Sequence, residues 1–155
     1  MSRKFVSGIY IAQGTGGPMT GHTSVSLKAR KGIEGDRYFS DSGKNRSSYK
    51  GKPDFEITLI ESEVIEEFNR KTGNNFHESD FRRNIVTTGV RLNDLEGKSF
   101  TVSGIEMYGV RLCEPCRSLQ ERLAVSVLPE LVGKGGLRAQ IKRSGVVKVG
   151  DLVGG

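Results

Sequence analysis

Short stretches in which apolar and polar residues alternate recur along the chain and predict β-strands. A period of two places every second side chain on the same face, so one face of such a strand is buried. Other strands are expected where β-branched and aromatic residues concentrate, and a Ser-Gly pair between two such stretches predicts a hairpin. The predicted strands cover residues 5–12, 25–29, 55–60, 84–88, 100–102, 105–108, 137–141 and 146–149.

One stretch has the periodicity of an amphipathic helix. In residues 61–71, Val64, Ile65 and Phe68 form an apolar stripe. Acidic residues near the start and basic residues near the end suit the helix dipole, and Gly73 is a stop signal. Two further helical segments are expected, at residues 117–123 and within residues 125–132.

Glycine changes this picture most. The chain holds 21 glycines in 155 residues, about twice the usual share of about 7%, and they are spread along it as breaks between short segments. Such punctuation favours a mainly β protein of the α+β class with a few helices, built as a barrel or folded sheet. No linker-like stretch divides the sequence, so residues 1–155 are predicted to form a single domain.

Charge and hydropathy narrow the class of protein. The 24 basic and 18 acidic side chains give a net charge of +6, which is compatible with a non-enzymatic nucleic-acid-binding barrel. Few aromatic residues accompany the basic ones, however, so a solvated basic surface is the favoured interpretation and nucleic acid is not an expected partner. No apolar run approaches the ~18 residues of a membrane span, and the first residues lack the apolar core of a signal peptide. We therefore expect a cytoplasmic protein without a membrane partner.

The motif with the most reactive side chains is the pair Cys113 and Cys116, which encloses Glu114 and Pro115. Two thiols at this spacing can form a redox pair or half of a zinc site, and either can act alone as a soft metal ligand. A structural zinc site lacks two further ligands at a suitable spacing. A thioredoxin-like site lacks its context, because no parallel strand–helix alternation is apparent. A buried structural role is the alternative for each thiol. Cys116 is the better functional candidate, because it would precede the helix predicted at residues 117–123.

Two polar motifs complete the set of candidate residues. Arg82 and Asn84 flank Arg83 just before a predicted strand; a guanidinium grips phosphate or carboxylate, and an amide can pair with the edge of a heterocycle. A solvated basic turn is the alternative, and spacing alone favours it. Asp36 and Arg37 follow Gly35 in a turn where Asp36 is expected to have a structural role, while the role of Arg37 is open.

The order of these motifs resembles the MOSC family, the molybdenum-cofactor sulfurase C-terminal domain family. The resemblance spans residues 5–153 and implies a β-barrel that binds a molybdopterin-type cofactor. It departs from the family pattern at Tyr38, where many members carry histidine, and it fits a stand-alone, minimal member. The motifs that carry it lie at residues 32–37, 57–60, 82–86, 95–97 and 113–116.

The resemblance also implies roles for single residues. Cys116 would be the catalytic residue that coordinates molybdenum or carries sulfur, Arg82 and Asn84 would grip the cofactor, and Thr58 and Arg37 would line the same pocket. One implied function is the reduction of N-hydroxylated small molecules, with electrons from separate donor proteins because two cysteines are too few for an iron–sulfur cluster. The other is a persulfide or cofactor carrier that works with proteins of cofactor maturation.

Overall fold

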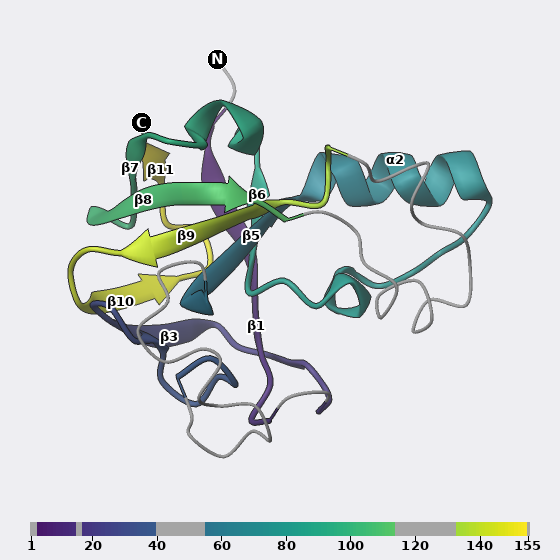
Figure 1. Cartoon of the computed structure of the whole chain (residues 1–155). Helices are drawn as coiled ribbons and strands as arrows, with labels where there is room; N and C mark the ends of the chain where they lie inside the picture. Colours follow the sequence, from purple (N-terminus) through teal and green to yellow (C-terminus); the bar gives the residue numbers. More distant parts are fainter. Residues whose placement is uncertain (1–2, 15–16, 40–54, 114–132, 155) are drawn as a thin grey trace.

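Two β-sheets build the described part of the fold (Figure 1). The structure is a computed structural model that describes residues 3–14, 17–39, 55–113 and 133–154. The larger sheet has the strand order β11-β7-β8-β9-β5-β6-β1-β2, and the smaller has the order β10-β3-β4. The strands are β1 (Phe5–Ile11), β2 (Thr20–Gly21), β3 (Ser24–Lys28), β4 (Gly32–Ile33), β5 (Ile57–Glu61), β6 (Ile85–Thr88), β7 (Ser99–Val102), β8 (Ile105–Leu112), β9 (Leu137–Ile141), β10 (Gly145–Lys148) and β11 (Val153–Gly154).

The larger sheet curls, and β1 contacts the segment that leads into β11 (Figure 1). The Val6 amide donates to the Asp151 carbonyl at 2.9 Å, and the Gly150 amide donates to the Val6 carbonyl at 2.7 Å. A bridge between Phe5 and Leu152 continues this contact. The predicted mainly β fold of the α+β class, with a barrel-type sheet, is therefore confirmed.

Each predicted strand has an observed counterpart, with small shifts at the ends, and β8 extends beyond its prediction to Leu112. The predicted helix is confirmed as α2 (Ser62–Thr72), which ends at Gly73 with a left-handed φ of 71°. The helical segments expected at residues 117–123 and 125–132 lie outside the described residues. Among the helices that the structure describes, none is both long and apolar enough to cross a membrane.

Several short or long-range features were not predicted. The strands β2 and β4 and the single-turn 3-10 helices η2 (Glu78–Phe81) and η3 (Leu92–Leu95) are too short to produce a period. The prediction that the chain contains no parallel strand–helix unit was wrong. The strands β5 and β6 are parallel neighbours, and α2 lies between them in the chain. A pairing direction depends on contacts between distant residues, so the pattern within each strand does not contain it.

Alternate side chains of β5 belong to different layers, and this alternation positions the site. Ile57 and Leu59 join the main hydrophobic core between the sheets. Ile60 instead belongs to a second cluster, in which Ile65 and Phe68 of α2 cover the other face of the sheet. Thr58 therefore shares the outer face with Ile60, because residues two apart on a strand point the same way.

Candidate functional site

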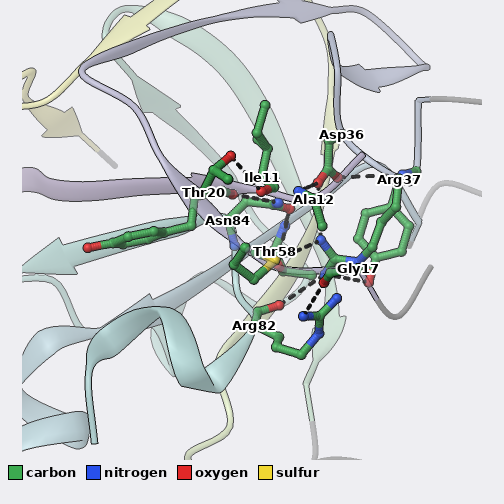
Figure 2. A network of polar contacts seen from close by, with 12 residues as sticks. Ile11, Ala12, Gly17, Thr20, Asp36, Arg37, Thr58, Arg82 and Asn84 are labelled. Atoms are coloured by element: carbon green, nitrogen blue, oxygen red, sulfur yellow. Dashed lines mark hydrogen bonds and ion pairs between the residues drawn. The ribbon is translucent and has the colours of Figure 1, made fainter. Parts of the chain in front are cut away.

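Four of the five predicted site residues lie in one polar cluster (Figure 2). Arg37 follows β4, Thr58 lies in β5, and Arg82 and Asn84 lie between η2 and β6. The structure thus brings together residues that are up to 47 positions apart, counted as 84 − 37. The fifth residue, Cys116, lies outside the described residues.

Asn84 and Thr58 form the buried base of this cluster. The Asn84 Oδ1 atom accepts from the Thr58 amide at 3.0 Å and from the Thr58 hydroxyl at 3.2 Å. The Asn84 Nδ2 group donates to the Tyr10 carbonyl at 3.1 Å, so one side chain joins β5 to β1. Asn84 is fully buried and Thr58 is 1% exposed. This geometry gives both residues a framework role, and contact of the Asn84 amide with a heterocycle edge stays a prediction.

Arg82 lies two residues before Asn84 and has an uncommon backbone conformation. It caps the end of η2 with φ 59° and ψ 34°, in the left-handed region that costs an L-residue about 1–2 kcal/mol. Its Nη1 atom donates to the Gly17 carbonyl at 2.7 Å. The next residue, Arg83, points to another segment, where its Nε donates to the Gly135 carbonyl at 2.9 Å. The two neighbouring guanidinium groups therefore contact two different loops.

Asp36 and Arg37 form a buried ion pair beside Arg82. Arg37 Nη1 lies 3.0 Å from Asp36 Oδ1, and the side chains are 7% and 0% exposed. Arg37 Nη2 donates to the Arg82 carbonyl at 2.9 Å, and its Cζ atom lies 4.4 Å from the centre of the Tyr38 ring. The structural role expected for Asp36 agrees with its burial. Asp36 thus balances the charge of Arg37 within the cluster.

Cys113 begins the cysteine motif at the end of β8. Its thiol is free and 1% exposed, and its amide donates to the Gly136 carbonyl at 2.7 Å. The neighbouring Gly135 carbonyl accepts from Arg83, as described above. We call residues 82–84, which contain Arg82 and Arg83, the arginine turn. Cys113, the described end of the cysteine motif, and this turn thus contact the same glycine pair, Gly135 and Gly136.

Sequence reasoning missed an aromatic and basic group next to these residues. Arg138 of β9 stands directly opposite Thr58 in the antiparallel pair, so both side chains lie on the outer face. Its Cζ atom lies 5.0 Å from the centre of the Phe55 ring, and the Phe55 and Tyr38 rings are 6.0 Å apart. The alternation of Leu137, Arg138 and Ala139 indicates an outward-facing arginine, but only the register of β5 and β9 places it beside Thr58.

The polar cluster presents guanidinium, amide and hydroxyl side chains. No group of three or more His, Cys, Asp or Glu side chains that could hold a metal occurs among the residues described. The Arg82 guanidinium would suit the terminal phosphate of the cofactor that the family resemblance implies.

Comparisons with known proteins agree with this fold. The structure is similar to the YuaD protein from Bacillus subtilis, with a TM-score of 0.79 and 20% identity over 98% of this chain and 94% of that one. It is also similar to YiiM from Geobacillus stearothermophilus, with a TM-score of 0.73 and 16% identity over 97% of this chain and 74% of that one. YiiM from Escherichia coli gives a TM-score of 0.70 and 19% identity over 99% and 69% of the two chains. These TM-scores show a shared fold.

Sequence comparison identifies the family. No curated protein matches the chain significantly. The model of the MOSC domain matches residues 46–154, which is more than half of the sequence. The matched region includes Thr58, Arg82 and Asn84, the residues that form most of the polar cluster. The chain therefore belongs to the MOSC domain family.

Proposed function

We propose that this protein binds the molybdenum cofactor through Cys116 and reduces N-hydroxylated small molecules with electrons from separate donor proteins. The observation that carries the proposal is the convergence of Arg37, Thr58, Arg82 and Asn84 on one site in a MOSC domain. Proteins of this family are linked to the molybdenum cofactor. The residues that form the cluster are those to which the family resemblance assigns cofactor binding.

Arg82 is the residue that we assign to the cofactor's phosphate. A guanidinium binds phosphate through charge-assisted hydrogen bonds, which are about twice as strong as neutral ones. Asn84 and Thr58 hold the backbone around Arg82 in place through their mutual hydrogen bonds. Arg37 is the second guanidinium of the site and contacts the Arg82 carbonyl.

Cys116 is the residue that we assign to molybdenum. When bound, the cofactor would supply the redox change, while the protein would supply a ligand and the residues that hold and orient the cofactor. The Cys113 amide contacts Gly136, next to the residue that Arg83 contacts. The described end of the cysteine motif therefore lies close to the turn that contains Arg82, which supports this assignment.

The test is the molybdenum and pterin content of protein purified from a host that makes the cofactor. The wild type should retain both in near-stoichiometric amounts, and Cys116→Ser should lose molybdenum while keeping the fold. The matched control is Cys113→Ser, which changes the other thiol of the motif and should have a milder effect. Equal loss in the two variants would favour a paired-thiol site. Absence of metal and pterin from the wild type, even after incubation with free cofactor, would reject the proposal.

A second measurement separates turnover from transport. Loaded wild-type protein should reduce N-hydroxylated substrates when an electron donor is added, and Cys116→Ser should not. Stable retention of the cofactor without turnover, together with its release to another cofactor-dependent protein, would instead support a carrier of persulfide or cofactor. The partners proposed for these two cases are electron-donor proteins and proteins of cofactor maturation, respectively.

A further inference from the structure

We propose that Asp36 and Arg37 are positioning residues that hold Arg82 in the orientation in which it binds an anion. The inference rests on the proposed function, because it takes Arg82 as the group that contacts the cofactor's phosphate. It assigns Arg37 a different role from that of a direct ligand. In this role, the Arg37 guanidinium acts through the backbone of Arg82.

Asp36 is the fixed support of this arrangement. Its carboxylate is fully buried. Oδ1 accepts from the Ala12 amide at 3.1 Å and from Arg37 Nη1 at 3.0 Å, and Oδ2 accepts from the Tyr38 amide at 3.5 Å. The contact with Ala12 ties the carboxylate to the end of β1, which belongs to the larger sheet. Through these hydrogen bonds, Asp36 fixes the Arg37 guanidinium relative to the larger sheet.

Arg37 connects this support to the arginine turn (Figure 2). One end of its guanidinium bonds Asp36, and the other donates to the Arg82 carbonyl at 2.9 Å. The face of the guanidinium packs 4.4 Å from the centre of the Tyr38 ring. Its hydrogen bonds, which also reach Met19 Sδ and the Tyr38 hydroxyl, and the aromatic face fix the orientation of this planar group. A lysine in its place could not reproduce that fork.

Arg82 requires such support because of its backbone conformation. Its φ of 59° places a residue with a Cβ atom in the left-handed region, which is intrinsically unfavourable. The hydrogen bond from Arg37 to its carbonyl stabilises this turn. The turn in turn sets the direction of the Arg82 side chain, whose Nη1 reaches the Gly17 carbonyl at 2.7 Å. Loss of the ion pair should therefore misdirect the Arg82 guanidinium.

The direction in which Asp36→Asn changes phosphate affinity distinguishes a positioning role from through-space electrostatics. Asp36→Asn removes a negative charge close to the anion site, so through-space electrostatics alone predicts tighter phosphate binding. The same change replaces an acceptor of charge-assisted hydrogen bonds and loosens Arg37, so positioning predicts weaker binding. The two effects have opposite signs.

The experiment titrates the full chain with inorganic phosphate and follows the backbone amide resonance of Asn84 by NMR. Asp36→Asn should raise the dissociation constant at least about threefold, a coupling typical of residues in one hydrogen-bond network. Asp94→Asn is the matched control: it removes the same charge from an exposed carboxylate that pairs with Arg91 at 3.4 Å. This control should not weaken phosphate binding. Unchanged or tighter binding in Asp36→Asn would overturn the positioning role.

A double-mutant cycle tests the route through Arg82. Arg37→Gln should weaken phosphate binding in the wild-type background and have no further effect in the Arg82→Gln background. Additive losses would show that Arg37 binds phosphate itself, and they would overturn the inference. The cycle also decides the matter if Asp36→Asn does not fold. Val147→Ala is a control for a general loss of stability. It creates a cavity at a fully buried position in the smaller sheet, away from the site, and should leave phosphate binding intact.

The failure of this inference is distinguishable from the failure of the proposed function. If wild-type protein shows no phosphate effect at Asn84, the anion site is absent, and both the phosphate contact and the positioning pair are rejected. If the wild type binds phosphate and retains pterin while Asp36→Asn binds phosphate as well as the wild type, only the positioning pair is rejected.

Discussion

We predict that Glu56 makes the stability of this protein fall as pH rises, in the direction opposite to that of a carboxylate whose pKa is lowered by folding. It is 4% exposed and precedes β5, where its Oε1 accepts from the Ile141 amide at 2.8 Å. Burial raises the pKa of Glu56 from 4.5 to about 7, although the hydrogen bond from Ile141 and the positive charges of Arg30 and Lys142 partly oppose this rise. The carboxyl group therefore holds a proton in the folded protein at pH values where the unfolded chain has lost it.

The sign and size of the effect follow from this difference. Between pH 4.5 and about 7, the folded state binds more protons than the unfolded state, so the free energy of unfolding falls as pH rises through this window. The full contribution is present below the unfolded pKa and is lost above the folded one. At 1.36 kcal/mol per pH unit, the upper limit of the loss is about 3 kcal/mol. Glu56→Gln removes the titrating group and keeps an acceptor for the Ile141 amide.

Chemical denaturation at about pH 5 and about pH 8 measures the effect. Relative to the wild type, Glu56→Gln should gain up to about 3 kcal/mol as pH rises over this range, because only the wild type loses stability through Glu56. Glu34→Gln is the matched control, since the Glu34 side chain is 49% exposed and pairs with Lys28 at the surface. Parallel pH profiles of the wild type and Glu56→Gln would refute the assignment of a buried, high-pKa carboxyl group.

Two further substitutions test the framework of the site by their effect on the free energy of unfolding. Asn84→Ala should cost about 2–4 kcal/mol, measured by denaturant unfolding, because the Thr58 amide and the Tyr10 carbonyl each lose a buried partner; a loss below about 1 kcal/mol would contradict this framework role. Gly136→Ala should cost more than about 3 kcal/mol, measured by thermal unfolding, since φ is +112° and a Cβ atom would collide with the Leu59 carbonyl. Gly73→Ala is its control: φ is +71° but nothing lies within 4 Å, so a cost of only about 1 kcal/mol is expected, and equal losses at the two glycines would argue against the close approach at Gly136.

The sequence predicted those elements whose signal is local. Alternation in β3 and β9 and the apolar stripe of α2 are visible within one segment, because a half-buried strand or helix repeats its pattern every two or 3.6 residues. The parallel pairing of β5 with β6 has no such local signal. Short elements such as η2 also escape, since a single turn contains too few residues to show a period.

The residues of the polar cluster could be named from the sequence, but their arrangement could not. Arg82 and Asn84 attract attention as a motif, and the family resemblance assigns them to a cofactor. Their different contacts appear only in three dimensions. The Asn84 side chain forms hydrogen bonds with Thr58 and Tyr10, while the Arg82 side chain donates to the Gly17 carbonyl. The same two residue types could occupy a solvated turn in another chain with no difference in local sequence.

Two distant segments constrain the turn formed by residues 82–84 from opposite sides. Thr58 holds the amide of Asn84 through its hydroxyl, and Arg37 holds the carbonyl of Arg82, two residues earlier. These contacts fix both ends of a three-residue turn whose first residue has an unfavourable backbone conformation. Without them, the left-handed conformation would relax, and the Arg82 side chain would sample several directions. Anion binding at Arg82 would then carry an additional ordering cost, so residues that never touch the ligand would still determine its affinity.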